Sequence, residues 1–345
     1  MPSLNRIKLA IMALNWNIPK FDAHVHLNTN RDALMRLGIE NNISYLSINT
    51  DIPFFDSLEN QEIVVNGLRS KYPNNVNYVT SFSISGWGTP EWEEKSIRQI
   101  QESLKNGAIG VKVWKNIGMN LQDKNGSYIG IDHSSFDAIF NYLEKNDVVV
   151  LGHIGEPKNC WLPLTEMTVD ADREYFKKHP EYHMYLHPEL PSYEDHLEAR
   201  NNRLLKNPRL RYVGLHLGSQ EWETDEVGRF LDKFPLAAVD LAERICHLQH
   251  QAVTNWQKVY DFFIKYQDRI IYGSDVIDDN SLTELELMSV MEKKYQGHWQ
   301  FFTSSDEMNA PKVSASFCGL GLPTTVVEKI YYANALKWYK NLKHS

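Results

Sequence analysis

Cysteine is scarce in this chain of 345 residues, which has only Cys160, Cys246 and Cys318. An odd and sparse set argues against a disulfide framework and favours a reducing compartment. A chain of this length buries roughly three-quarters of its unfolded surface when it folds, so it needs no disulfide bonds to be stable.

Basic residues are outnumbered, because 36 lysines and arginines face 44 aspartates and glutamates, which gives a formal net charge of −8. Binding to phosphate backbones needs basic surface, so this balance argues against nucleic acid as a partner. Long apolar runs are missing as well, and none reaches the roughly 18 residues that span a bilayer. The patch at residues 9–14 is too short for the core of a signal peptide, and no small-residue cleavage site follows it. We therefore expect a cytoplasmic protein that binds neither nucleic acid nor membrane.

Eight short β-rich runs alternate with helical stretches along the chain. The runs are 19–27, 43–49, 76–84, 108–114, 148–153, 210–217, 236–241 and 269–275. Several are apolar almost throughout, which is typical of a parallel sheet covered by helices. The helical candidates are 32–38, 59–71, 91–106, 134–145, 192–206, 223–233, 254–267 and 282–295.

Eight strand–helix units predict an α/β fold, the (β/α)₈ TIM barrel. A doubly wound sheet is the alternative, but its first strand is usually followed by a glycine-rich turn, and residues 26–30 contain no glycine. We expect one domain over residues 1–345, with the barrel core at 19–300 and an extra C-terminal helix at 324–342.

An unusually long segment separates the fifth run from the helix at 192–206. Residues 157–191 contain five prolines and several aromatic residues. A connection of this length after a strand is far beyond the usual two to six residues. Such loops lie on the catalytic face of a barrel, so we interpret 157–191 as a lid or substrate wall, with an arm that contacts another subunit as an equally favoured alternative.

Histidines and one aspartate stand at the carboxyl ends of four predicted strands. His24 and His26 belong to the first strand, and because alternate residues share a face they project together, with Asp22 one step deeper on that face. His153, His216 and Asp275 end the fifth, sixth and eighth strands. The ends of barrel strands meet around one mouth, where this set suits Zn²⁺ or a similar divalent ion with an open position for water.

These motifs resemble those of a known enzyme family. FDAHVH, LGH, GLHLG and YGSD, together with the C-terminal IYYANALKWY, are similar to the amidohydrolase superfamily. The closer resemblance is to its amidohydrolase 2 branch, whose members are similar to aminocarboxymuconate semialdehyde decarboxylase. The resemblance covers residues 21–339.

The resemblance implies one divalent metal ion, Zn²⁺ with Mn²⁺ as the alternative, held by His24, His26, His153 and Asp275. His216 would then act as a base or electrostatic partner for the metal's water, and Asp275 commonly shares that role in the superfamily. The residues themselves do not separate ligand from base among these five positions.

Lys112 lies on the fourth predicted strand, where a buried lysine is costly unless it is paired. Binuclear members of the superfamily use a carbamylated lysine near this place to bridge two metals. Alternatively, the ammonium group of Lys112 holds a substrate carboxylate, or it pairs with Asp22 or another carboxylate and has no functional role.

Substrate contacts are expected from residues just beyond the strands: Lys112, Trp114, Glu156 and, in the long loop, Trp161. The function that we expect is hydrolysis of an amide, lactone or ester of a small organic molecule, by a metal-activated water. The alternative is a non-oxidative decarboxylase of an aromatic or unsaturated acid. The carboxylate of Asp22, two residues before His24, does not distinguish between the two reactions. A metal-free binding module fits the ligand set less well, and a homodimer is left open.

Overall fold

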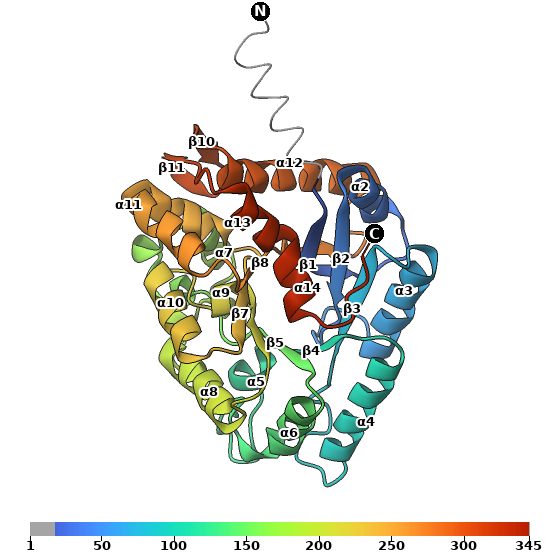
Figure 1. Cartoon of the computed structure of the whole chain (residues 1–345). Coiled ribbons are helices and arrows are strands. Elements are labelled where there is room, and N and C mark those ends of the chain that lie inside the picture. The colour runs from blue at the N-terminus through green and yellow to red at the C-terminus, as the bar shows by residue number, and fades with distance from the viewer. Residues whose placement is uncertain (1–17, 345) are drawn as a thin grey trace, which may run out of the picture.

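Nine parallel strands form one curled sheet, and helices cover its outer face (Figure 1). The computed structural model describes residues 18–344, so the apolar patch at 9–14 lies outside the described residues. The architecture confirms the predicted α/β barrel. In spatial order the strands are β8 (Ile270–Ile271), β7 (Ala237–Asp240), β6 (Tyr212–Gly214), β5 (Val149–Gly152), β4 (Gly110–Val113), β3 (Val76–Ser81), β2 (Ile43–Ile48), β1 (Lys20–Leu27) and β9 (Val276–Asp278).

Two short strands, β8 and β9, share the eighth position of the barrel. β8 pairs with β7, whereas β9 pairs with β1. In the segment between β8 and β9, the backbone N–H of Asp275 donates to the carbonyl of His24 at 2.8 Å. The N–H of Ala23 donates to the carbonyl of Tyr272 at 3.1 Å. These bonds hold Asp275 beside the strand that carries His24.

Helices follow the strands as the alternating pattern predicts. They are α2 (Ala33–Asn41), α3 (Leu58–Lys71), α4 (Trp92–Lys105), α6 (Asp137–Lys145), α8 (Tyr193–Lys206), α10 (Thr224–Lys233), α11 (Ile245–Lys265) and α12 (Glu284–Thr303). Shorter helices are α5 (Asn116–Met119), α7 (Asp170–Lys178), α9 (Leu215–Gly218), α13 (Thr324–Glu328) and α14 (Asn334–Trp338). Within residues 18–344, none is both long and apolar enough to cross a bilayer.

The structure differs from the sequence prediction at α11 and at a hairpin that follows α12. Helix α11 begins at Ile245 rather than 254 and continues across a kink at Asn255. Its first residues are buried almost continuously, so they lack the amphipathic period on which the prediction depended. The second feature is an unpredicted antiparallel hairpin, β10 (Glu307–Ala310) and β11 (Val313–Cys318), which packs against α11.

The barrel interior is filled by inward-facing strand residues and closed by the C-terminal segment. Phe21, Ile48 and Leu151 belong to an inner apolar cluster that also contains Trp338 and Tyr339. Helix α13, a π-helical turn at Lys329–Ala333 and α14 replace the continuous helix predicted at 324–342. The end of the chain therefore completes the inner core and leaves the carboxyl ends of the strands for a site.

Candidate metal centre

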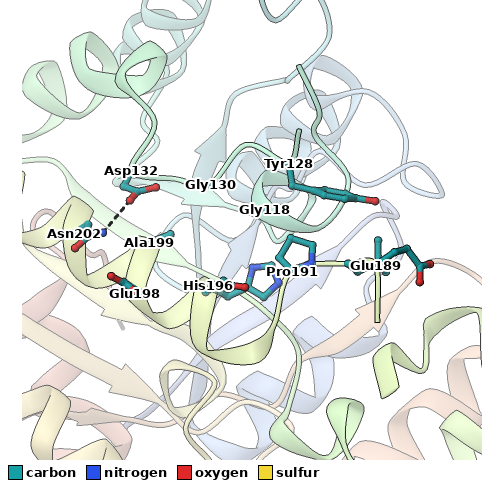
Figure 2. Close-up of a pocket in the computed structure, with 12 residues that line it drawn as sticks. Gly118, Tyr128, Gly130, Asp132, Glu189, Pro191, His196, Glu198, Ala199 and Asn202 are labelled. Carbon is teal, nitrogen blue, oxygen red and sulfur yellow. Dashed lines mark hydrogen bonds between the residues drawn. The ribbon is translucent and has the colours of Figure 1, made fainter. Parts of the chain in front are cut away.

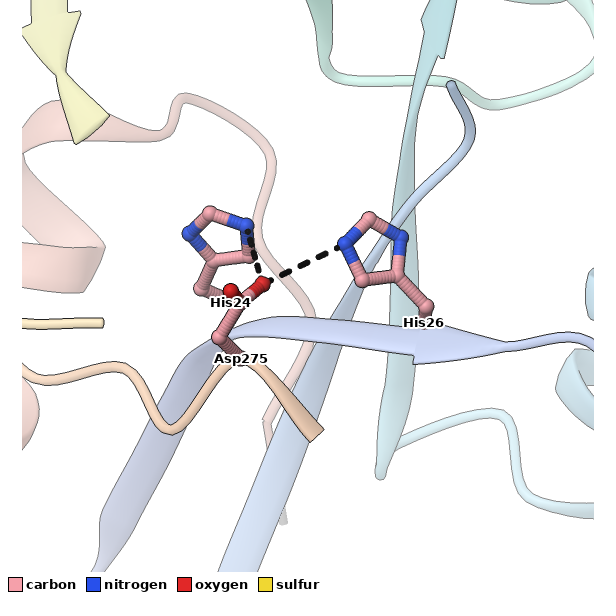
Figure 3. A group of neighbouring side chains, drawn as sticks. All are labelled: His24, His26 and Asp275. Carbon is pink, nitrogen blue, oxygen red and sulfur yellow. Dashed lines mark ion pairs between the residues drawn. The ribbon is translucent and has the colours of Figure 1, made fainter. Parts of the chain in front are cut away.

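Three of the predicted ligands converge at the carboxyl end of β1. The Nε2 atom of His24 lies 3.1 Å from Oδ1 of Asp275, and the Nε2 atom of His26 lies 3.4 Å from the same oxygen (Figure 3). Their candidate ligand atoms all lie within 4.8 Å of one another. Two imidazoles and a carboxylate at this separation form a donor set that suits Zn²⁺ or Mn²⁺.

A β-bulge in β1 decides which side chains reach this group. The pairing of β1 with β2 shifts between Asp22 and Val25, so one extra residue is accommodated there. The expectation that Asp22 shares the face of His24 is therefore wrong. Asp22 is buried outside the group, where it accepts hydrogen bonds from the hydroxyl of Tyr295 and the N–H of Ser274, both at 2.8 Å.

The second nitrogen of each of these histidines is held by a protein oxygen. Nδ1 of His26 donates to the carbonyl of Ile48 at 2.7 Å, and Nδ1 of His24 lies 2.6 Å from Oδ2 of Asp240. A donating Nδ1 leaves the lone pair of a neutral imidazole on Nε2, which is the atom that faces Asp275. The histidines are thus oriented for a cation before any cation binds.

His216 belongs to the same cluster through a tight turn after β6. Its backbone N–H donates to Oδ1 of Asp240 at 2.5 Å, and its Nδ1 donates to the carbonyl of Ala242 at 2.9 Å. The ring lies 5.0 Å from the ring of His24. His216 has φ +57° and Asp275 has φ +60°, a left-handed conformation that costs free energy in residues other than glycine and is often found at functional sites.

His153 lies next to His216 rather than within the group of three. The two rings are 4.2 Å apart. The Nε2 atom of His153 is buried and has no hydrogen-bond partner in the described part of the chain. Buried polar atoms usually have a partner, so this atom fits the role of a ligand to a bound ion.

Opposing charges dominate the electrostatics of the centre. Burial disfavours protonation of His24, but the carboxylates of Asp275 and Asp240 outweigh it and raise the pKa of His24 to about 9. Burial likewise opposes ionisation of Asp275, yet the positive charge of His24 holds its pKa well below the ordinary value. Positive charge is therefore strongly favoured between these carboxylates, as a metal-binding site requires.

Lys112 of β4 projects toward the barrel interior. Its neighbours Val111 and Val113 pack in the outer apolar layer, so alternation turns Lys112 inward. The side chain makes no hydrogen bond or ion pair with any residue of 18–344, and it does not pair with Asp22. Burial lowers the pKa of Lys112 to about 8, although Asp275 and Asp240 favour its charged form.

Two residues near the centre did not belong to the site predicted from the sequence. The guanidinium of Arg244 is close enough to His216 to help lower the pKa of that ring, and its Nε has no hydrogen-bond partner among the described residues. The ring of Phe55 lies edge-on to His26 at 5.1 Å. The sequence feature that could have indicated Phe55 is an aromatic pair in the loop after β2. The feature that could have indicated Arg244 is its position just after β7.

The segment 157–191 is a folded unit with its own small core. Cys160, Met167, Phe176 and Met184 form this buried apolar cluster. The backbone N–H of Lys158 donates to Glu221, and Asp172 of α7 lies 3.2 Å from His247 of α11. The unit is therefore fastened to the barrel at several points.

The predicted substrate contacts are distributed unevenly around the mouth. Trp161 packs against Tyr193 and His196 of α8, with ring centroids 5.5 and 5.7 Å apart, rather than against the histidine group. Glu156 forms an ion pair with Lys115, which joins the loops after β5 and β4. Trp114 lies beside this pair, with the ammonium of Lys115 at 5.8 Å from its ring.

A groove of about 530 Å³ lies apart from the histidine group, between the loop after β4 and α8 (Figure 2). Tyr128, Pro191 and His196 line it, and Asn202 donates to Asp132 at its edge at 3.0 Å. Burial lowers the pKa of His196 to about 4, so that ring is neutral. The candidate metal centre and this groove therefore lie at different places in the structure.

Comparisons with known proteins agree with the fold and with the family resemblance. A family model described as Amidohydrolase matches residues 78–340. No curated protein sequence matches the chain significantly.

Solved structures with the same fold include 2,6-dihydroxybenzoate decarboxylase from Rhizobium, with 13% identity and a TM-score of 0.53 over 93% of this chain and 98% of that chain. A complex of 2,6-dihydroxybenzoate decarboxylase with 2,6-dihydroxybenzoate has 14% identity and a TM-score of 0.52, with the same coverage. 4-Oxalomesaconate hydratase from Rhodopseudomonas palustris has 12% identity and a TM-score of 0.45 over 93% of this chain and 95% of that chain. At these identities the two matches with 2,6-dihydroxybenzoate decarboxylase concern the fold alone.

Proposed function

Since this chain belongs to the amidohydrolase family, we propose that it is a metal-dependent hydrolase that cleaves an amide, lactone or ester bond in a small organic acid. The observation that carries the proposal is the placement of His216 beside the group of His24, His26 and Asp275. Hydrolysis needs a positioned water, a base for its proton and a group that stabilises the developing oxyanion.

His24, His26 and Asp275 would hold the ion, and His153, which follows β5, would complete its ligands. We propose Zn²⁺, with Mn²⁺ as the alternative. When bound, such an ion acts as a Lewis acid on the substrate oxygen and lowers the pKa of water toward about 7.

His216 would accept the proton of the attacking water. Its Nδ1 is committed to the carbonyl of Ala242, so the lone pair of the neutral ring is on Nε2. Burial, together with the charges of Arg244, His24 and Lys112, keeps the pKa of His216 well below its ordinary value, against the pull of Asp275. The ring is therefore neutral at pH 7 and able to accept a proton.

The positive charges of Lys112 and Arg244 favour a substrate that carries a negative charge. Both are cations close to His216, and neither the ammonium of Lys112 nor Nε of Arg244 has a hydrogen-bond partner in the described residues. Two such groups at one mouth would bind a carboxylate at a distance from the bond that is cleaved. Trp114, Glu156 and Trp161 would then shape the outer part of the site.

Decarboxylation is the second candidate, and the same pair of cations favours it. Lys112 and Arg244 would also bind the carboxylate of an acid that loses CO₂. Proteins of this fold include a decarboxylase that has been crystallised with an aromatic acid. The two reactions differ in the product, which is an acid in one case and CO₂ in the other.

A substrate panel of lactones, amides, esters and hydroxybenzoates, assayed for acid release and for CO₂ with enzyme loaded with Zn²⁺ or Mn²⁺, tests the proposal. Hydrolysis is expected, with about one metal equivalent per chain by elemental analysis. Acid release from a carboxylated lactone should show a higher KM in Lys112→Met, whereas the exposed Lys95→Met should match the parent protein. Release of CO₂ without hydrolysis would favour the decarboxylase, and failure to bind either metal would overturn both candidates.

A further inference from the structure

A second cavity, of about 310 Å³, lies outside the strand barrel between α11, α12 and the β10–β11 hairpin. Its lining contains none of His24, His26, His153, His216 and Asp275. Its volume is at the lower end of the range that small-molecule sites occupy. The cavity is therefore large enough for a small ligand and separate from the candidate metal centre.

One part of the cavity wall is apolar. Ile245 and Cys246 from the start of α11 and Met308 from β10 are all buried, and Val290 of α12 is half exposed. Ala310 continues this surface along the hairpin. A ligand that reached this wall would gain free energy by removing apolar surface from water.

The charged part of the wall holds more cations than anions. Glu243 is the only acidic residue among the described lining residues, and it forms ion pairs with both Lys294 and Lys312. Lys293 lines the cavity as well. One carboxylate shared by two ammonium groups leaves an excess of positive charge, which would attract a second anion.

His298 adds a hydrogen-bond donor to the same cavity. Its Nδ1 lies 2.9 Å from the hydroxyl of Tyr272, and burial raises the pKa of that phenol well above its ordinary value, so the hydroxyl keeps its proton and donates it. Burial and the charge of Lys294 lower the pKa of His298 to about 3, so the ring is neutral and carries its proton on Nε2. That N–H has no acceptor among the described residues, whereas a ligand carboxylate would provide one.

We propose that this cavity is a binding site for a small amphipathic carboxylate. The carboxylate lies between Lys312, Lys294 and His298, and the aliphatic or aromatic body packs against Ile245, Met308 and Val290. Charge selects the head group, because a cationic or neutral amphiphile would leave the lysine excess uncompensated. This site does not depend on the reaction at the metal centre.

Binding of octanoate to the full-length, metal-loaded protein, measured by titration calorimetry, tests the site. We expect one saturable site per chain with a dissociation constant of about 1 mM or below, which is ordinary for a ligand of this size. Octanol, which has the same chain without the charge, should bind at least about tenfold more weakly.

A matched pair of variants locates the bound octanoate. Val290→Trp fills the cavity from its rim and should weaken octanoate binding at least about tenfold. Leu285→Trp adds the same side chain to an exposed position of α12 outside the cavity and should leave the affinity unchanged. Lys312→Met should weaken octanoate but not octanol, and thermal melting confirms that each variant is folded.

Three results would overturn the proposal. The first is the absence of saturable octanoate binding in the folded parent protein. The second is equal affinity in Val290→Trp and Leu285→Trp, which would put octanoate elsewhere, the metal centre included. The third is a change from dimer to monomer in Val290→Trp without octanoate binding to the parent, which would assign the cavity to a second copy of the chain.

Discussion

The Nδ1 atom of His24 lies 2.6 Å from Oδ2 of Asp240, the last residue of β7. The other oxygen of the same carboxylate accepts the backbone N–H of His216 at 2.5 Å. One buried side chain thus fixes a ring that faces the metal position and the turn that carries the proposed base. Carboxylate partners of this kind orient ligand histidines and raise their basicity.

Replacement of Asp240 by asparagine tests this double role. The variant should bind Zn²⁺ about 10- to 100-fold more weakly, because the His24 ring loses the partner that fixes its tautomer. Competition with a chelating dye measures the affinity. Asp278→Asn is the control, since Asp278 is also buried near a strand end but pairs with Arg31. Equal zinc affinity in the two variants would mean that Asp240 does not support the metal centre.

The variant His216→Asn tests whether His216 acts as a base or as a metal ligand. Because the proposed role of His216 is to accept a proton, the variant should keep about one metal equivalent and lose turnover about 10²- to 10⁴-fold. Elemental analysis and steady-state kinetics on the same preparation give both quantities. A variant that purifies without metal, and does not regain it on addition of Zn²⁺, would show instead that His216 is a ligand.

Glu243→Gln should make the protein less stable at neutral pH and less sensitive to acid. Burial disfavours the charged form of Glu243, but Lys294 and Lys312 outweigh it and lower its pKa to about 2. A lowered carboxylate pKa contributes stability that is present above the unfolded value of about 4.5 and is lost as the pH falls toward 2.

Denaturant unfolding at pH 7 and pH 3 measures the difference. The free energy of unfolding of Glu243→Gln should be about 2–3 kcal/mol lower than that of the parent protein at pH 7. This difference should become smaller at pH 3. The exposed Glu174→Gln should change neither value. A constant gap at both pH values would mean that the ion pairs of Glu243 do not account for its contribution.

The sequence predicted the barrel because its signals are local. The β-rich runs ending at His153, His216 and Asp275 are separated by helices, and parallel strands place their carboxyl ends at one mouth. The convergence of His24, His26 and Asp275 follows from that rule and from the alternation in β1. The predicted strand ends therefore indicated the position of the candidate site as well as the fold.

The features that the sequence did not predict depend on contacts between distant segments. The bulge that turns Asp22 toward Tyr295 depends on the pairing with β2, and alternation within β1 gave no sign of it. Asp240 acquires its role only because its side chain reaches both His24 of β1 and the turn after β6. The segment 157–191 appeared as a loop because its core consists of single residues that are spread along the segment. Such long-range pairings leave no periodic pattern in a single sequence.

The contact between Asp172 and His247 predicts how the segment 157–191 affects turnover. Asp172 of α7 also accepts a hydrogen bond from Asn159 at 2.9 Å, so it ties the start of the segment to its helix and to α11. Burial opposes its ionisation, but His247 and Arg244 outweigh burial and lower the pKa of Asp172 to about 2. Asp172→Asn should loosen the segment, which would admit water to the mouth and slow turnover at least about tenfold while the metal content stays unchanged.

Limited proteolysis within residues 160–184 and kinetics of the metal-loaded enzyme measure the two effects together. Glu174→Gln, an exposed change on the same helix, is the matched control and should behave like the parent protein. If Asp172→Asn is cleaved faster but turns over normally, the segment is not a lid. A smaller solution mass in that variant would then support the alternative that the segment contacts another subunit. Slower turnover with unchanged cleavage would place the effect of Asp172 on Arg244 and the mouth rather than on the motion of the segment.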